Sequence, residues 1–293
     1  MIKRLPEWFK QPLPDEAAFK IKQQLSDSCV HTVCQEAHCP NISRCFSNNE
    51  LTFLILGPTC TRNCTFCAVD KSKLKDIPIN KNEHRVVASF VLRFKLTYAV
   101  ITSVTRDDLF DGGANAFVQT VEEIRNLSPM TEIEVLTPDF GGCTSSIFKV
   151  AEASPSVFGH NLETVKRIYP QIRPEADYLR SLKLLKEVKI HYPSLITKSS
   201  LMVGLGESNL ELEKALCDLI DCNCDIVTIG QYLAPSLNHY PVEEYIREEV
   251  FLQYKEFAQK LGFKAVSSGP LVRSSYQAGQ LFKQVRELKL CMI

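Results

Sequence analysis

From Leu51 onward, short apolar runs alternate with longer segments in which apolar residues recur every three or four positions. The runs are almost wholly apolar, as in TFLIL (52–56) and DIVTI (225–229), which is typical of strands covered on both faces. Alternation of such strands with amphipathic helices predicts a parallel sheet with right-handed crossovers, closed or nearly closed into a barrel. The predicted fold class is α/β, a partial (β/α)6 TIM-like barrel with a Cys-rich N-terminal extension and a C-terminal extension.

The elements expected from these patterns fall into three regions. The strands are expected at 52–56, 98–103, 132–136, 156–158, 200–203 and 225–229. Helices are expected between them at 83–94, 114–126, 177–191 and 209–221. After the sixth strand, the sequence predicts a helix at 242–261, a short strand near 264–267 and a last helix at 277–290. Residues 1–50 show little periodicity and are expected to form the N-terminal extension. Residues 51–240 then form the barrel, and residues 241–293 the C-terminal extension.

The charges of the chain are balanced, with 34 Lys and Arg against 34 Asp and Glu. A global basic field of the kind that attracts nucleic acid is therefore not expected. No run approaches the roughly 18 uninterrupted apolar residues of a membrane helix, and the first residues lack the apolar core of a secretory signal. The sequence predicts a cytoplasmic protein with neither a nucleic-acid nor a membrane partner.

Polar, glycine-containing segments follow the predicted strands. In chain order they are GPTCTRNCTFC, VTRDDLFDGG, TPDFGG, GHNLET, GLGES and GQYLAPS. In α/β barrels the chemistry lies in the loops at the carboxyl ends of the strands. These segments are therefore expected to form the rim of an active site.

Six of the twelve cysteines fall between Cys34 and Cys67, and three of them follow the first strand directly as Cys60-x3-Cys64-x2-Cys67. Three thiolates can bind three irons of a cubane cluster and leave the fourth iron open. An open position is what distinguishes catalytic from structural metal sites. The alternative is a zinc knuckle, which needs a fourth Cys or His.

A second cysteine group, Cys34-x4-Cys39-x5-Cys45, precedes the barrel. By itself it indicates a second metal site, either zinc or iron–sulfur. His38 is a conceivable zinc ligand, although it adjoins Cys39 in the chain. The other cysteines follow no ligand spacing and are expected to be buried free thiols: Cys29, Cys143, Cys217, Cys222, Cys224 and Cys291.

The spacing of the first group, with Phe66 just before its last cysteine, resembles the signature of the radical S-adenosylmethionine superfamily. The resemblance implies that the open iron chelates the methionyl moiety and that S-adenosylmethionine is cleaved to a 5′-deoxyadenosyl radical, with Phe66 near the adenine. The run SLMVGLGE (200–207) is similar to the superfamily's Gly-x-Ile-x-Gly-x-x-Glu element, so Gly204 and Glu207 are expected to support the adenine. Ser200 departs from the glycine usual there.

The second group, together with Arg273-Ser274-Ser275-Tyr276, resembles the lipoyl synthase family, as do ITSVTRDDLFDGGA, IEVLTPDF and SSGPLVRSSYQA. This resemblance implies two [4Fe–4S] clusters, the second ligated by the three cysteines and Ser275. The implied reaction inserts two sulfur atoms at C6 and C8 of an octanoyl chain and consumes the second cluster.

The implied protein substrate is an octanoylated lipoyl carrier domain, in an acyltransferase subunit of a 2-oxoacid dehydrogenase or in the glycine cleavage H protein. A flavodoxin or ferredoxin is the implied electron donor. Asn161 and Glu163 are expected to contact ribose or methionyl groups, and Arg173 and Lys198 the methionyl carboxylate; structural ion pairing is the alternative for each. Arg106-Asp107-Asp108 is either a solvated turn or a cofactor contact.

Two other classes of protein remain open at this stage. One is an electron-transfer or structural two-cluster protein without catalysis, which needs four protein ligands per cluster. The other is a different radical enzyme, such as a biotin-synthase-like sulfur inserter or a methylthiotransferase, which lacks the serine of the RSSY run.

Overall fold

The computed structural model describes residues 5–11, 13–28, 30–71 and 79–290. Its main sheet has the strand order β1-β2-β5-β6-β7-β8-β9-β10. Only β1 (His31–Thr32) runs antiparallel to its neighbour. The parallel strands are β2 (Thr52–Ile55), β5 (Tyr98–Ser103), β6 (Glu132–Leu136), β7 (Val157–Gly159), β8 (Ile196–Val203), β9 (Ile226–Gln231) and β10 (Ala265–Gly269). The sheet curls without pairing β10 to β1 among the described residues, so the partial α/β barrel is confirmed.

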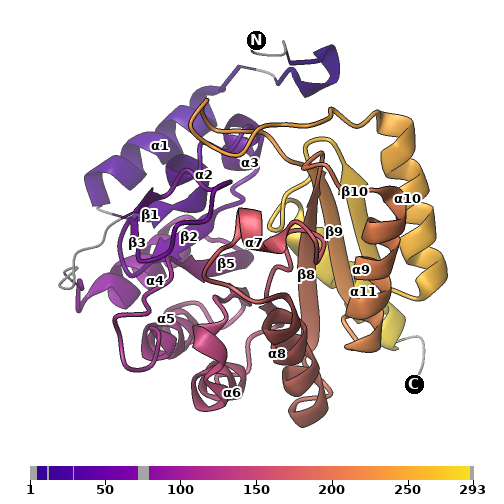
Figure 1. Ribbon diagram of the computed structural model, residues 1–293. Coiled ribbons are helices and arrows are strands. Elements are labelled where there is room, and N and C mark those ends of the chain that lie inside the picture. Colours follow the sequence, from indigo (N-terminus) through magenta and orange to yellow (C-terminus); the bar gives the residue numbers. More distant parts are fainter. Residues whose placement is uncertain (1–4, 12, 29, 72–78, 291–293) are drawn as a thin grey trace.

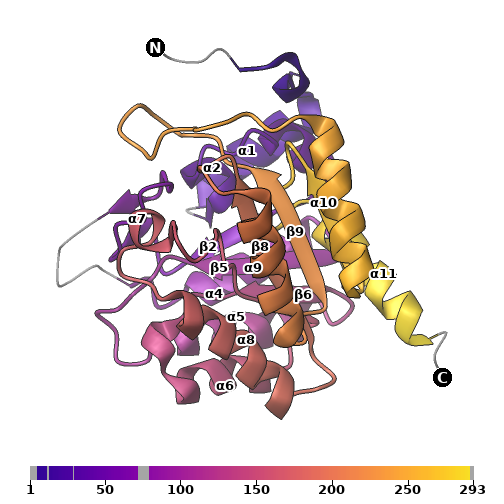
Figure 2. The ribbon, with the colours of Figure 1, turned by 45° about the vertical axis from the view of Figure 1, so that its right-hand side comes forward.

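Helices cover the outer face of this sheet (Figures 1 and 2). Each turns an apolar stripe inward; α5, for example, buries Phe117, Val121 and Ile124. The helices of this layer are α4 (Glu83–Arg93), α5 (Ala114–Leu127), α6 (Thr144–Glu152), α8 (Tyr178–His191), α9 (Asn209–Asp221) and α10 (Glu248–Leu261). The short helix α6 was not predicted.

The predicted start of α10 at residue 242 was wrong, because residues 242–247 belong to no helix or strand and α10 begins at Glu248. The side chain of Gln231 at the end of β9 holds them: its Nε2 donates to the Glu244 carbonyl at 2.8 Å, and its Oε1 accepts from the Ile246 N–H at 2.8 Å. A side chain that occupies these backbone groups prevents helical pairing there.

The expectation of little periodicity before residue 50 was also wrong. Helix α1 (Glu16–Ser28) buries the narrow stripe Ala18, Ile21 and Leu25, and packs on α3 (Ile42–Ser47). Between them, α2 (Val33–Glu36) begins at Thr32, whose hydroxyl caps it. The 3₁₀ turn η1 (Glu7–Phe9) lies over the connection from β9 to α10, where the Phe9 and Tyr245 rings are 5.8 Å apart (Figure 1).

The C-terminal helix α11 (Ala278–Leu290) closes the amino ends of the strands. Its Leu281, Phe282 and Val285 pack in one cluster with residues at the amino ends of β7, β8, β9 and β10. Tyr98 at the start of β5 joins them, with its ring 5.8 Å from that of Phe282. The carboxyl ends of the strands are thereby left as the mouth of the barrel.

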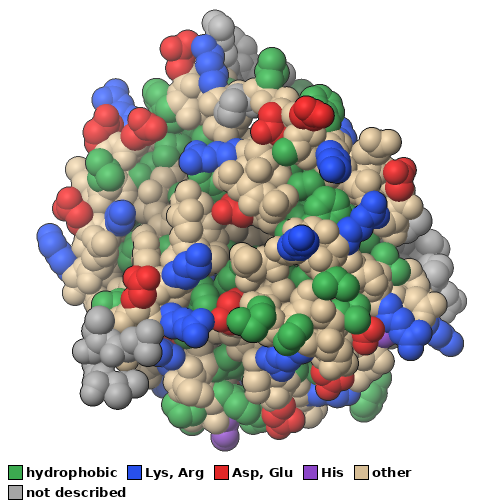
Figure 3. Space-filling model, turned by 180° about the vertical axis from the view of Figure 1, so that it is seen from behind, with side chains coloured by type: hydrophobic (Ala, Val, Ile, Leu, Met, Phe, Trp, Pro, Cys, Tyr) green, Lys and Arg blue, Asp and Glu red, His purple; other side chains and the backbone are tan. Residues whose placement is uncertain are grey.

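The face shown in Figure 3 carries Lys and Arg side chains interspersed with Asp and Glu, in line with the balanced composition. None of the helices in the described part of the chain combines the length and apolar content needed to cross a membrane.

Candidate active site

One cavity of about 840 Å³ opens inside the barrel. Its lining includes both cysteine groups and the serine of the C-terminal run: Cys34, Cys39, Cys45, Cys60, Cys64, Cys67 and Ser275. All six of these thiols are free. Segments separated by more than two hundred positions in the chain therefore share one space.

The loop that carries Cys60, Cys64 and Cys67 is tied by its backbone to neighbouring loops. The N–H of Thr61 donates to the Thr105 carbonyl at 3.0 Å, and the N–H of Thr65 donates to the Ile172 carbonyl at 2.9 Å. Cys60 lies in the short strand β3 (Thr59–Cys60), which pairs with β4 (Asp70–Lys71). The thiols thus sit on a braced loop at the carboxyl end of β2.

Burial raises the pKa of the Cys67 thiol to about 12, with Cys64 and Cys60 adding to the effect. Such a thiol becomes a thiolate ligand only where a cation stabilises it. No three His, Cys, Asp or Glu side chains among the described residues converge on a single metal-ion position. A cubane cluster takes each thiolate on a different iron, and the three soft donors around a common space fit such a cluster.

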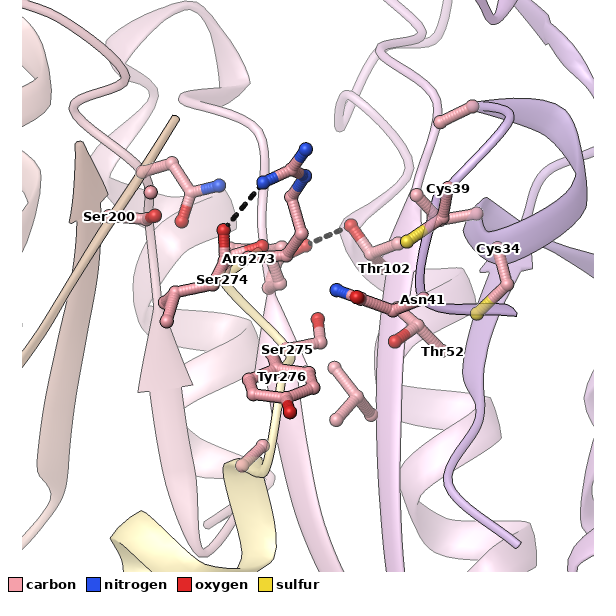
Figure 4. A pocket seen from close by; sticks show the side chains of 18 of the residues that line it. Cys34, Cys39, Asn41, Thr52, Thr102, Ser200, Arg273, Ser274, Ser275 and Tyr276 are labelled. Carbon is pink, nitrogen blue, oxygen red and sulfur yellow. Dashed lines mark hydrogen bonds between the residues drawn. The ribbon is translucent and has the colours of Figure 1, made fainter. Parts of the chain in front are cut away.

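The second cysteine group lines the same cavity and comes from the N-terminal part of the chain. Cys34 lies in α2 and Cys45 in α3, and the N–H of Cys39 donates to the Cys34 carbonyl at 3.1 Å. Burial, and then Cys39, raises the pKa of Cys34 to about 12. Figure 4 shows Cys34 and Cys39 on one side of the cavity and Ser275 on the other, with Asn41 between them.

Ser275 lies in the segment between β10 and α11, which packs closely on β9. A Cβ at Gly230 would lie 2.0 Å from the Val272 carbonyl oxygen, so only glycine permits this approach. The residue after Ser275 is Tyr276, and the centre of its ring lies 5.7 Å from the guanidinium of Arg44. The glycine and the cation–π contact both hold this segment near the second cysteine group.

Four of the residues expected to contact the cofactor line the cavity: Phe66, Asn161, Glu163 and Arg173. The Asn161 amide donates to Glu163 at 3.0 Å, and Arg173 donates to the Asn161 carbonyl at 3.0 Å. Burial raises the pKa of Glu163, and Arg173 opposes this rise. A buried cation and a half-buried carboxylate therefore face the Cys60–Cys67 loop together.

Three other expected residues lie elsewhere. The Lys198 side chain is buried within the barrel. Its ammonium group forms an ion pair with Glu134, 2.8 Å from a carboxylate oxygen. The Glu207 carboxylate accepts from the backbone N–H groups of Gly204 and Leu205 at 2.7 and 2.9 Å. Gly204 has φ +90°, so this pair shapes the turn after β8 and does not line the cavity.

The charged triplet after β5 is engaged in ion pairs. Arg106 is buried and binds Asp108 at 2.7 Å, while Asp107 binds Arg62 at 2.7 Å. The alternative of a solvated turn was therefore wrong for Arg106. Of the six cysteines without ligand spacing, Cys222 and Cys224 are buried and Cys217 is half-buried, but Cys143 is exposed, against expectation; Cys29 and Cys291 lie outside the described residues.

Two residues to which the sequence assigned no role contact the Cys60–Cys67 loop. His239 contacts the Cys67 carbonyl through Nε2 at 3.1 Å, and the N–H of Tyr240 donates to the Thr65 carbonyl at 2.9 Å. His239 and Tyr240 lie in the connection between β9 and α10, and their hydrogen bonds brace the cysteine loop. No local pattern marks such contacts, because they join residues more than 170 positions apart.

The comparisons with known proteins identify the class of protein. Residues 54–219 match the family model described as the Radical SAM superfamily. The crystal structure of methylornithine synthase superposes with a TM-score of 0.55 at 12% identity, covering 73% of this chain and 70% of that one, a likeness of fold alone. The fold and the site define a radical S-adenosylmethionine enzyme.

Two curated relatives narrow this class. The lipoyl synthase of Caldicellulosiruptor saccharolyticus is 51% identical over 284 residues, covering 97% of this chain and 99% of that protein. The lipoyl synthase of Caldicellulosiruptor bescii is 53% identical over 274 residues, covering 93% and 94%. The chain belongs to the lipoyl synthase family, and S-adenosylmethionine and an iron–sulfur cluster are the cofactors that membership implies.

Proposed function

We propose that this enzyme inserts two sulfur atoms, at C6 and C8, into an octanoyl chain carried on a lysine of a lipoyl carrier domain. The observation that carries the proposal is the sharing of one cavity by two cysteine triads and Ser275. A carbon that loses hydrogen to one group and gains sulfur from another must lie within reach of both. A common cavity satisfies this condition without moving the substrate between sites.

The cysteines and Ser275 would hold two [4Fe–4S] clusters. Cys60, Cys64 and Cys67 would bind the first and leave one iron open for S-adenosylmethionine. Cys34, Cys39, Cys45 and Ser275 would bind the second. When bound, these groups supply a 5′-deoxyadenosyl radical on one side of the cavity and sulfur on the other. The serine is a hard oxygen ligand among soft sulfurs, and its protonation would release it from iron.

The remaining cavity residues bind and orient. Arg173, buried beside the Cys64 thiol, would face the methionyl carboxylate, and Asn161 with Glu163 would contact the amino or ribose groups. Phe66 would lie against the adenine. Apolar residues that line the cavity would receive the octanoyl chain and exclude water: Leu54, Val100, Leu136, Met202 and Leu233.

The proposed protein partners follow from this reaction. The substrate would be an octanoylated carrier domain, of a 2-oxoacid dehydrogenase acyltransferase subunit or of the glycine cleavage H protein. A flavodoxin or ferredoxin would deliver the electrons.

The test is anaerobic reconstitution, iron analysis and mass measurement of an octanoylated carrier after reductant and S-adenosylmethionine are added. We expect about eight irons per chain and a carrier that gains two sulfurs and, in its cyclic disulfide form, loses two hydrogens. Ser275→Ala should abolish this mass gain while 5′-deoxyadenosine release continues, and Ser274→Ala is the matched control. An unchanged carrier with both clusters intact would refute the substrate.

A further inference from the structure

An ion network built on the buried side chains of Arg62 and Asp139 joins the first cysteine loop to its neighbours. The Arg62 guanidinium, 5% exposed, donates from Nη2 to Asp139 at 2.7 Å and holds both carboxylate oxygens of Asp107 at 2.7 and 2.8 Å. The other Asp139 oxygen accepts from Arg180 Nε at 2.8 Å. Asp139 itself is fully buried. Four charged side chains therefore form one continuous network.

The four members come from separate segments of the mouth. Arg62 lies between Cys60 and Cys64, Asp107 follows β5, Asp139 follows β6, and Arg180 is in the first turn of α8. The N–H of Arg62 also points at the Cys60 sulfur, 3.5 Å away. One side chain thus connects the cysteine loop to the two neighbouring loops at the carboxyl ends of the strands.

The geometry of the network depends on the planar, forked guanidinium of Arg62. Arg62 makes three hydrogen bonds to two carboxylates that lie on different loops, which a compact ammonium group cannot reproduce. Burial works to raise the pKa of Asp139, but the hydrogen bonds and charge of Arg62 outweigh it and hold that pKa below its usual range. Asp139 is therefore ionised at neutral pH, and its distances to both arginines are those of charged pairs.

We propose that Arg62, held by Asp139 and Asp107, is the positioning residue that fixes the Cys60–Cys67 loop over the ends of β5 and β6. The inference rests on the proposed function in one respect: the loop is taken to hold the cluster that binds S-adenosylmethionine. Cys60, Cys64 and Cys67 line the cavity but Arg62 does not, so its effect reaches the chemistry through the placement of the thiols. A loop free to shift would lose the common geometry of three thiolates, and with it the open iron.

The test compares Asp139→Asn with Asp225→Asn. Asp225 is the matched control because it is likewise a buried carboxylate between two cations, Lys189 and Lys264, at the amino end of β9, away from the mouth. In the reduced, metal-free full chain, we expect alkylation of Cys60 and Cys64 to be at least fivefold faster in Asp139→Asn than in wild type. Cys217 on α9 serves as the internal reference, and Asp225→Asn should stay within twofold of wild type.

The reconstituted enzyme provides the second measurement. S-adenosylmethionine should bind at least tenfold more weakly to Asp139→Asn, and the change that it causes in the electron paramagnetic resonance signal of the reduced cluster should diminish. Asp225→Asn should retain both within twofold. Equal behaviour of the two variants in labelling and binding would overturn the proposal.

Arg62→Lys separates position from charge and is the milder variant for folding. It keeps the cation but loses the fork, so we expect it to behave as Asp139→Asn does. Wild-type labelling and binding in Arg62→Lys would also overturn the proposal, since charge alone would then suffice. A wild-type chain that holds no iron and binds no S-adenosylmethionine would instead refute the proposed function, while the labelling rates still decide the role of Arg62.

Discussion

The side-chain amide of Asn41 donates a hydrogen bond of 2.6 Å to the backbone carbonyl of Leu271. Asn41 lies between Cys39 and Cys45, and Leu271 begins the segment that leads to Ser275. The bond joins residues 230 positions apart, and Asn41 itself is buried, with 1% of its surface exposed. It is a direct link between the N-terminal cysteines and the C-terminal serine.

Asn41→Leu keeps the volume but removes the donor, leaving the Leu271 carbonyl without this partner. A lost buried partner costs about 1–3 kcal/mol, and the serine segment should separate from the cysteine loop. We expect reconstituted protein to hold about four irons where wild type holds about eight. Iron analysis and urea denaturation measure the two effects. Full iron loading in Asn41→Leu would show that the link is dispensable.

Gly230→Ala should displace the segment that carries Ser275 by a clash from β9. The added Cβ would lie 2.0 Å from the Val272 carbonyl oxygen, and backbone cannot yield as a flexible side chain can. We expect loss of the second cluster and of carrier modification, with S-adenosylmethionine binding kept. Gly269→Ala is the matched control: Gly269 pairs with Gly230 in the sheet, but its Cβ would meet only the Val272 side chain, at 3.4 Å. Equal iron contents in the two variants would contradict this account.

Tyr169→Phe should weaken the binding of S-adenosylmethionine. The Tyr169 hydroxyl accepts from Arg173 at 2.7 Å and bonds to Ser181 at 2.7 Å. A hydrogen bond to a charged group contributes about 1.5–3 kcal/mol, so affinity should fall roughly tenfold or more. Equilibrium dialysis with labelled cofactor measures this, and Tyr254→Phe, which loses a buried hydroxyl far from the site, should bind normally. Unchanged affinity in Tyr169→Phe would show that cofactor binding does not depend on Tyr169 holding Arg173 in place.

The same chain of hydrogen bonds requires neutral His160. Its Nδ1 lies 2.9 Å from the Thr137 carbonyl, which only accepts, so Nε2 accepts from Ser181 at 3.0 Å. Burial, and then the charge of Arg173, lowers the pKa of His160 to about 4. The unfolded chain, with an ordinary histidine pKa near ~6.5, therefore binds a proton at a higher pH than the folded chain does.

It follows that the stabilisation from neutral His160 is fully present above about pH 6.5 and is lost as the pH falls toward the folded pKa. We expect the free energy of unfolding to decline by up to about 1.4 kcal/mol per pH unit from this one proton between pH 6 and 4. His160→Gln should lack this part of the decline. Urea denaturation of the metal-free chain at several pH values gives the difference, and parallel pH profiles for the two proteins would refute it.

Much of the fold could be predicted because it depends on local periodicity. Strands β5 and β6 and helix α9 have the predicted bounds, since each carries its own apolar pattern and α9 has its own capping box from Ser208 and Glu211. Helix α1 escaped prediction because its buried stripe is narrow in a polar segment. The start of α10 escaped because it depends on Gln231, a side chain from another element.

The sequence by itself determined the order of strands and helices and the spacing of both cysteine triads, because those properties involve neighbouring residues. Only the tertiary structure decided that the triads share a cavity, that Lys198 pairs with Glu134, and that Arg62 meets Asp139 across 77 positions. The physical reason is burial. A charge taken out of water must find its counter-charge wherever the packed chain brings one, and that partner cannot be identified from its distance along the sequence.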